Sequence, residues 1–242
     1  MISTDPSGFL ARLLDAPGPS GFELPAARVW RQEAEEIADR LDLDVGGNSI
    51  ALLNPEGSPR VMLAGHVDEI GLIVTHIDED GFLYFDGIGG WDSQVLVGQR
   101  VRLQGREGEV AGVIGKKPIH LMKPDEREKV SKITDLWIDV GAADSKAAGE
   151  MGLRVGDPAV LDARMLRLGE GRIVSRAIDN RIGAFVVLEA LRLLAERAER
   201  PSACVAAVAT TQEEIAYHGG GARTSAHRIR PDEALVVDVT VA

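Results

Sequence analysis

Residues 61–66 read VMLAGH, an apolar run that ends in a glycine and His66, and Asp68 follows two positions later. A strand that is apolar on both faces is typical of the interior of a sheet that helices cover on each side. In open α/β sheets, ligands bind outside the carboxyl ends of the strands. The stretch therefore predicts a central strand that carries His66 and Asp68 at its ligand-binding end.

Acidic residues occupy comparable positions at three other places in the chain: Asp179, the pair Glu213 and Glu214, and Asp238. Each has an ordinary explanation when it is taken alone. Asp179 suits a helix N-cap, and Glu213 with Glu214 is consistent with a solvated pair. Asp238 differs, because a carboxylate that closes the apolar run 235–237 is costly to bury unless it is paired or coordinated. Together with His66, these residues predict one metal site assembled from distant parts of the chain.

Glu213 and Glu214 raise a geometric question because they are adjacent. Neighbouring residues of a regular strand point to opposite faces of a sheet. Both side chains can reach one site only where the chain leaves the strand ladder, and the glycine-rich segment 219–221 predicts such a departure.

Two kinds of pattern alternate along the chain and predict an α/β domain that is interrupted by a β domain. The outer parts combine apolar strands with helical stripes such as that of residues 180–200. Residues 69–163 carry short alternating runs separated by glycine-containing turns. We therefore expect an α/β domain built from residues 1–68 and 164–242, with the β domain inserted at 69–163.

Local signals place three further elements. Ser20 and Glu23 have the spacing of a capping box, which predicts a helix from there through about Arg40. Strands are expected over residues 45–53 and over residues 235–241.

The composition excludes several classes of partner. The chain has 242 residues and a formal net charge of −11, which argues against binding to nucleic acid or to an anionic membrane. Cys204 is the single cysteine, so an intramolecular disulfide is impossible and a reducing compartment is favoured. The start of the sequence has no signal-peptide pattern, and no apolar run is long enough to span a membrane. The expected location is the cytoplasm.

Six stretches, taken in chain order, resemble the motifs of the M42 family of metallo-aminopeptidases: PSGFE at 19–23, AGHVDEIG at 64–71, GWD at 90–92, RAIDNR at 176–181, QEE at 212–214 and VDVT at 237–240. The resemblance covers essentially the whole chain. It implies a zinc-peptidase-like domain with a mixed sheet flanked by helices, interrupted by a small β-barrel-like domain. It also implies two divalent metal ions, zinc or cobalt, and homo-oligomers that assemble through the inserted domain, from dimers up to dodecamers.

The resemblance also implies a role for each candidate residue. The metal ligands would be His66, Asp179, Glu214 and Asp238, with Asp179 shared between the two ions. Glu213 would be the general base, and Asp68 would fix the orientation of His66. The substrates would be short peptides with a free N-terminus.

One implied ligand has no counterpart in the sequence. The resemblance implies a further histidine after the Asp238 motif, and the chain is expected to be truncated because it stops at Ala242. His218 is the only nearby substitute. Besides an aminopeptidase, the sequence therefore allows a catalytically incomplete fragment or a non-catalytic assembly subunit. A glycosidase (endoglucanase) with two carboxylates is the third reading, although it would leave the predicted metal ligands unexplained.

Overall fold

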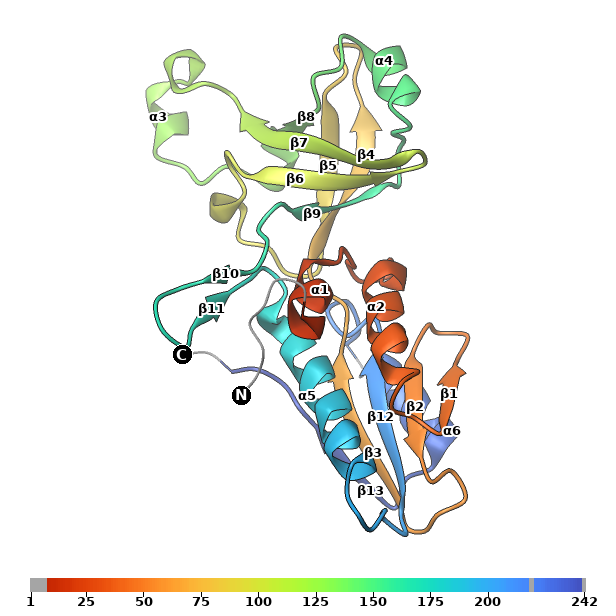
Figure 1. Ribbon diagram of the computed structural model, residues 1–242. Coiled ribbons are helices and arrows are strands. Elements are labelled where there is room, and N and C mark those ends of the chain that lie inside the picture. Colours follow the sequence, from red (N-terminus) through yellow and green to blue (C-terminus); the bar gives the residue numbers. More distant parts are fainter. Residues whose placement is uncertain (1–7, 218–219, 241–242) are drawn as a thin grey trace. The chain divides into compact units, whose positions relative to one another are not determined.

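The structure is a computed structural model that describes residues 8–217 and 220–240, and Figure 1 traces these residues from the red N-terminal helices to the blue C-terminal strand. The chain divides into two compact units. The first joins Met1–Glu69 to Arg164–Ala242, and the second is Ile70–Ala163. Each unit has a hydrophobic core of its own residues.

The first unit is built on a mixed five-stranded sheet with the order β1-β2-β12-β3-β13. Its strands are β1 (Arg40–Leu43), β2 (Ser49–Leu53), β3 (Arg60–His66), β12 (Cys204–Thr210) and β13 (Glu233–Val236). The pairs β1–β2 and β2–β12 are antiparallel, whereas β3 lies parallel to both β12 and β13. The interior position of β3 confirms the prediction made from residues 61–66.

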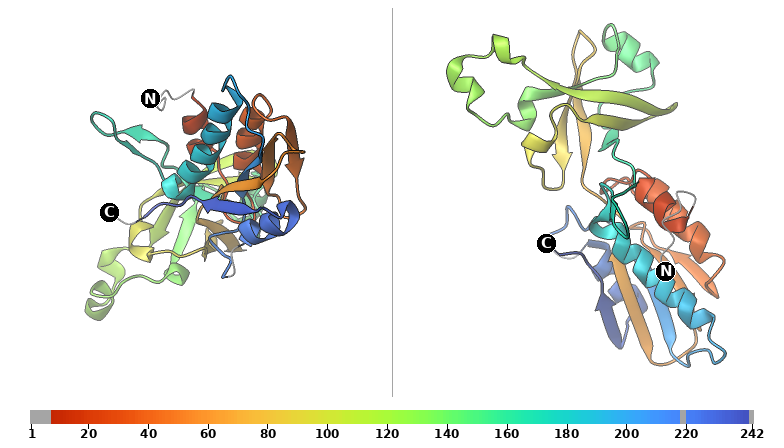
Figure 2. Two further views of the ribbon diagram at one scale, coloured as in Figure 1. Left: turned by 90° about the horizontal axis from the view of Figure 1, so that it is seen from below. Right: turned by 60° about the vertical axis from the view of Figure 1, so that its left-hand side comes forward.

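Helices cover both faces of this sheet, as Figures 1 and 2 show. They are α1 (Phe9–Asp15), α2 (Leu24–Ala34), α5 (Ile178–Ala195) and α6 (Gly220–Ile229). Alternate residues of β2 point to opposite faces: Ala51 and Leu53 join the core under α1, α2 and α5, whereas Ile50 and Leu52 join a second cluster that contains Ile229 of α6. The predicted mixed sheet flanked by helices is confirmed.

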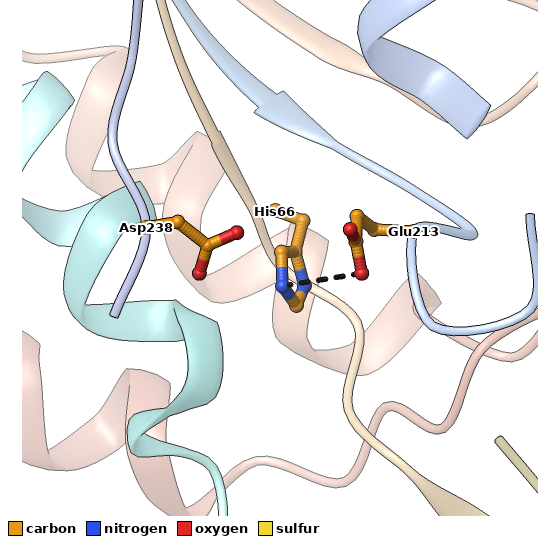
Figure 3. A group of neighbouring side chains, drawn as sticks. All are labelled: His66, Glu213 and Asp238. Carbon is orange, nitrogen blue, oxygen red and sulfur yellow. Dashed lines mark ion pairs between the residues drawn. The ribbon is translucent and has the colours of Figure 1, made fainter. Parts of the chain in front are cut away.

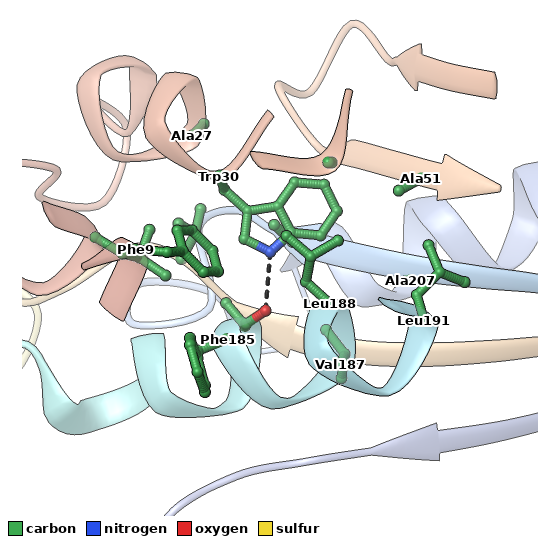
Figure 4. Packing of buried hydrophobic residues seen from close by; sticks show 14 of the residues in the cluster. Phe9, Ala27, Trp30, Ala51, Phe185, Val187, Leu188, Leu191 and Ala207 are labelled. Carbon is green, nitrogen blue, oxygen red and sulfur yellow. Dashed lines mark hydrogen bonds between the residues drawn. The ribbon is translucent and has the colours of Figure 1, made fainter. Parts of the chain in front are cut away.

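Aromatic side chains tie the three helices of one face together (Figure 4). Trp30 of α2 is fully buried, and its indole N–H donates a hydrogen bond to the Ala184 carbonyl of α5 at 2.8 Å. The ring of Phe9 in α1 lies 5.4 Å from the ring of Phe185. This packing fixes the start of α5 relative to the sheet.

The backbone of α5 also approaches β3 very closely, because glycines stand at the point of contact. A Cβ on Gly65 would lie 2.4 Å from the backbone carbon of Gly183, which is far closer than van der Waals contact permits. Gly65 is followed directly by His66, and Asp179 lies four residues before Gly183. The two glycines therefore let His66 of β3 and Asp179 of α5 come together.

The second unit is a closed barrel with the strand order β4-β5-β8-β7-β6-β9, so the predicted barrel-like domain is confirmed. Its strands are β4 (Gly71–Ile77), β5 (Leu83–Ile88), β6 (Arg100–Gly105), β7 (Gly108–Lys116), β8 (Leu136–Asp139) and β9 (Pro158–Leu161). Helices α3 (Pro124–Arg127) and α4 (Ser145–Glu150) and three 3-10 turns, at Ser93–Val95, Ile119–Leu121 and Ile133–Asp135, join them. Inward-facing side chains such as Leu72, Phe85 and Leu103 fill the barrel.

Several local predictions are wrong. The second helix is Leu24–Ala34, and Arg40–Leu43 is a strand that pairs with β2. The strand expected over residues 45–53 begins only at Ser49. The predicted capping box is absent, because the Glu23 carboxylate accepts hydrogen bonds from Gly21 and Gln212 instead. The Glu23 side chain is therefore engaged by a distant segment through Gln212, which the local spacing does not indicate.

The last strand is shorter than expected. β13 ends at Val236 and lies at the edge of the sheet, with Leu235 and Val236 62% and 68% exposed. A short hairpin, β10 (Leu166–Arg167) with β11 (Ile173–Val174), completes the strands described in this unit. Within the described residues, no helix has both the length and the hydropathy needed to cross a membrane.

Candidate metal centre

His66 is the last residue of β3 and is 3% exposed. Its Nε2 lies 3.3 Å from Oδ1 of Asp179 and 3.7 Å from Oε2 of Glu213. On the other side of the ring, Nδ1 lies 3.2 Å from the Asp68 carbonyl oxygen and 3.4 Å from Oδ1 of Asp68. The imidazole is thus held between acidic groups from three different segments of the chain.

Asp68 is fully buried behind His66. Burial raises the pKa of its carboxyl group, but the His66 imidazole, the Glu214 backbone N–H and the Ser20 hydroxyl lower it, and the net direction is downward. Its Oδ2 accepts a hydrogen bond from the Glu214 N–H at 3.1 Å. Asp68 is therefore an ionised carboxylate that contacts both His66 and the loop bearing Glu214.

Asp179 does not cap the helix that follows it. It has non-helical dihedral angles, φ −78° and ψ 111°, and its side chain is 59% exposed and points to His66. The contact typical of an N-cap is made by Asn180, whose Oδ1 accepts a hydrogen bond from the Gly183 N–H at 3.1 Å. The N-cap explanation for Asp179 is wrong, because the neighbouring Asn180 takes that position and leaves Asp179 free to face the site.

Asp238 lies just beyond the edge strand β13 and is exposed. The expectation of a buried carboxylate at this position is wrong, because the apolar run before it forms an exposed edge. What places Asp238 is the preceding carbonyl of Val237, which accepts a hydrogen bond from Nδ2 of Asn180 at 2.7 Å. Figure 3 shows the His66 ring between the carboxylates of Asp238 and Glu213.

Glu213 and Glu214 follow a residue in the left-handed region, Gln212, with φ 58°. The chain leaves the ladder after Thr210, and this turn lets both glutamates reach the site, as their adjacency required. Burial is the largest of the effects that raise the pKa of Glu214 to about 7, followed by the neighbouring carboxylate of Asp179. A carboxyl group with such a pKa gains much from a nearby positive charge.

The six predicted residues lie in one cluster, which suits a cation. Two groups of three residues each offer ligand atoms that all lie within 4.8 Å of one another. One group is His66, Glu213 and Asp238, and the other is His66, Asp179 and Glu214. Imidazole nitrogen and carboxylate oxygen are common ligands of divalent transition metals. His218, the candidate for a further ligand, lies outside the described residues.

The electrostatics of the cluster agree with this interpretation. Burial lowers the pKa of His66, but Asp68, Glu213 and Asp238 outweigh it and raise that pKa to about 9. Two carboxylates face the same Nε2 atom, which is unfavourable unless a proton or a metal ion lies between them. The residues present therefore fit a divalent cation.

A buried ion network beneath the site was not predicted. Glu69, which follows Asp68, pairs with the guanidinium groups of Arg176 and Arg181 at 2.8 Å each. Arg181 is fully buried and donates a hydrogen bond to the carbonyl of Val67, the residue between His66 and Asp68. The motif RAIDNR contains both arginines, but nothing in the sequence indicates that they are buried.

Fold and site together define a class: an α/β protein with an imidazole–carboxylate cluster, suited to a divalent cation, at the carboxyl ends of its parallel strands. The family profile described as M42 glutamyl aminopeptidase matches residues 47–242. The chain belongs to the M42 peptidase family, and membership of this family implies divalent metal ions.

Relatives of known name agree with this assignment. The chain is 35% identical over 236 residues to a lysyl aminopeptidase of Pyrococcus furiosus, with 96% of this chain and 66% of the relative covered. It is 31% identical over 235 residues to a glutamyl aminopeptidase of Lactococcus lactis, with 95% and 65% covered. The chain thus spans slightly less than two thirds of the length of both relatives.

Solved structures show the same fold. A TET aminopeptidase from a marine sediment thaumarchaeote matches with a TM-score of 0.92 and 40% identity, covering 97% of this chain and 66% of that one. The TET1 peptidase of Pyrococcus horikoshii, which can assemble into a tetrahedron or a large octahedral shell, matches with a TM-score of 0.84 and 32% identity, covering 95% and 67%. A Thermotoga maritima protein named as an endoglucanase matches with a TM-score of 0.75 and 28% identity, covering 96% and 65%.

Proposed function

We propose that this chain is a metal-dependent aminopeptidase that removes N-terminal residues from short peptides with the help of two divalent ions, zinc or cobalt. The observation that carries the proposal is the position of His66, whose Nε2 is faced by Asp179 and Glu213 while Nδ1 is held by Asp68. Relatives named as lysyl and glutamyl aminopeptidases support the choice of reaction.

Each residue of the cluster has a task in this reaction. The residues that would hold the ions are His66, Asp179, Glu214 and Asp238. Divalent ions bound there would polarise the scissile carbonyl group and make a water molecule more acidic. Glu213 has a side chain 49% exposed, 3.7 Å from Nε2 of His66, so it is accessible to accept the proton of the attacking water and pass it to the leaving amine. Asp68 keeps the His66 ring oriented.

The relatives also support substrates with a free amine. Proteins named as a lysyl and a glutamyl aminopeptidase share 35% and 31% identity with this chain, and an aminopeptidase cleaves at a free N-terminus. This supports cleavage at the N-terminus over cleavage within a chain.

We further propose that the barrel, residues 70–163, carries the contacts between copies in a homo-oligomer that is built from dimers and extends up to a dodecamer. The assembly of the Pyrococcus horikoshii relative into closed shells supports this role. The cytoplasm is the proposed location, because the single cysteine, Cys204, is buried and unpaired, as suits a reducing compartment.

The test combines elemental analysis with a peptide assay. The protein is reconstituted with zinc or cobalt and desalted, and the ions per folded chain are counted. We expect two ions, chelator-sensitive release of the first residue from free-amine peptides, and no release from N-acetylated peptides. Peptide hydrolysis that persists after complete removal of metal would refute the proposal.

Two other outcomes would favour the alternatives. One ion per chain without peptidase activity would indicate a catalytically incomplete fragment or an assembly subunit. Metal-independent release of sugar from a glucan would favour a glycosidase, the activity after which one structural relative is named.

A further inference from the structure

The backbone at residues 211–214 lacks strand partners, because the ladder between β12 and β3 ends at Thr210. Backbone N–H groups that leave a ladder and remain buried need other acceptors. Here each acceptor is a side chain from a distant segment. The Thr211 N–H donates to Oδ1 of Asn48 at 2.9 Å, and the Gln212 N–H donates to Oε1 of Glu23 at 3.1 Å.

The third acceptor is Asp68, whose Oδ2 accepts the Glu214 N–H at 3.1 Å. Asn48, Glu23 and Asp68 thus form a clamp of three side chains around the turn. All three are at most 7% exposed, so water is a poor substitute for them. Asp68 also contacts His66, whereas Glu23 contacts the turn through the Gln212 N–H and Asn48 through the N–H and the hydroxyl group of Thr211.

Gln212 is the residue that most needs this clamp. Its backbone φ of 58° lies in a region that residues other than glycine rarely adopt. Gln212 directly precedes Glu213 and Glu214. Its left-handed conformation turns the chain away from the direction of β12 just before the two glutamates. The conformation of Gln212 therefore sets the direction in which the chain carries Glu213 and Glu214 relative to His66.

Glu23 also accepts a hydrogen bond from within its own segment. The same Oε1 atom accepts the Gly21 N–H at 2.7 Å, so one oxygen joins the PSGFE segment to the turn. This explains why the motif at 19–23 matters although it holds no candidate metal ligand. We propose that Glu23 is a positioning residue: by accepting the Gln212 N–H, it holds the turn so that Glu213 and Glu214 both face His66.

The inference rests on the proposed function for its kinetic readout. Two substitutions of Glu23 separate the effect of side-chain length from the effect of charge. Glu23→Asp keeps the charge but shortens the side chain by one methylene, so the carboxylate no longer reaches Gln212. Glu23→Gln removes the charge but keeps the length and a carbonyl oxygen that can accept both N–H groups. The matched control is Glu36→Asp, which shortens an exposed glutamate of the following segment.

We expect Glu23→Asp to lower kcat by about 10- to 100-fold, the effect of misplacing a reacting group, with KM within about threefold of the wild type. At saturating metal both ions should still bind, with a reduced affinity for the ion that Glu214 would hold. Amide hydrogen exchange at residues 212–214 should be faster in both metal-free and metal-loaded protein. Glu23→Gln and Glu36→Asp should behave like the wild type in all these respects.

Three results would overturn the inference. Glu23→Asp could retain slow exchange at Gln212, which would mean that the clamp does not depend on this contact. Glu23→Gln could lose activity while Glu23→Asp keeps it, which would assign Glu23 an electrostatic role. Loss of bound metal and of thermal stability together with kcat in Glu23→Asp would make its role purely structural. If the wild type cleaves no peptide, the proposed function fails, and the exchange comparison alone decides on the clamp.

Discussion

At the scale of single residues, the candidate metal centre is a buried imidazole surrounded by carboxylates that differ in their exposure. Asp68 is fully buried and lies behind His66, whereas Asp238 and Glu213 are exposed. The buried Asp68 can therefore orient the His66 ring, whereas the exposed Asp238 and Glu213 can contact substrate or solvent. Mutations of these two kinds of residue are expected to have different effects.

Replacing Glu213 by glutamine should abolish proton transfer while leaving the metal ligands in place. The amide has a similar shape but cannot accept a proton near neutral pH, so we expect kcat to fall by about 10²- to 10⁴-fold. Elemental analysis of the purified variant should show the metal content of the wild type. A variant that keeps more than about a tenth of the wild-type kcat would contradict the assignment of Glu213 as general base.

The metal-free protein should lose stability as the pH rises. The pKa of His66 is raised from 6.5 in the unfolded chain to about 9 in the folded one. Its contribution to the free energy of unfolding, about 3 kcal/mol at most, is therefore fully present below pH 6.5 and lost as the pH rises through about 9. Glu214, with its pKa raised to about 7, adds to the loss between its unfolded pKa and pH 7.

The measurement is the Tm of the metal-free protein from pH 6 to about 9.5, compared with that of His66→Asn. We expect the wild type to lose several degrees that the variant does not lose, on the order of 2–4 °C for each kcal/mol. Equal slopes for the two proteins would refute the assigned pKa shift. Bound metal should remove this loss of Tm with rising pH in the wild type, because the ion takes the place of the proton on Nε2.

At the scale of elements, the site depends on how closely α5 packs against β3. Gly65 and Gly183 permit the contact, and Asn180 then joins α5 to the segment that carries Asp238. Sequence periodicity identified the helix and the strand but not their distance. That distance brings Asp179 within 3.3 Å of His66.

Gly65→Ala should damage the fold and the metal site together. The added methyl group would lie 2.4 Å from the backbone of Gly183, and a backbone cannot move aside as a flexible side chain can. We expect a loss of about 1–3 kcal/mol in the free energy of unfolding and a clearly weaker affinity for cobalt. Gly90→Ala in the barrel, where an added Cβ would have no neighbour within 4 Å, is the control. Unchanged cobalt affinity in Gly65→Ala would show that the close contact does not position His66.

At the scale of the whole molecule, the two units have separate cores, and the barrel is inserted between two segments of the α/β unit. The first and last strands of the barrel, β4 and β9, are paired, with Leu72 opposite Ala159. The two ends of the insertion therefore lie close together within the barrel. A short linker can therefore replace the barrel and still join Glu69 to Arg164.

Replacing residues 70–163 with a short glycine–serine linker should leave a folded α/β unit that still binds metal, because all six candidate site residues belong to that unit. If the barrel carries the contacts between copies, the shortened protein should be a monomer while the complete chain is an oligomer. Light scattering with metal analysis checks both points. A shortened protein that still forms the same oligomer would refute the proposed role of the barrel.

The sequence by itself determined the type of fold and pointed to the candidate residues that the structure brings into one cluster. The apolar run before His66, the helical stripe at 180–200 and the ordered motifs are local features, and local features are readable from residue types and spacing. The fold class and the family that they predicted are confirmed. The interpretation of Asp179 as an N-cap and the expected burial of Asp238 were wrong, because each depended on a neighbour, Asn180 in one case and the edge of the sheet in the other.

Only the tertiary structure decided the distances and the protonation states. The contact between Gly65 and Gly183, the left-handed Gln212 held by Glu23, and the buried arginine pair around Glu69 all join residues that are far apart in the chain. The pKa of His66 depends on carboxylates from several segments. Electrostatic and packing energies depend on separation in space, and no pattern of neighbouring residues encodes that separation.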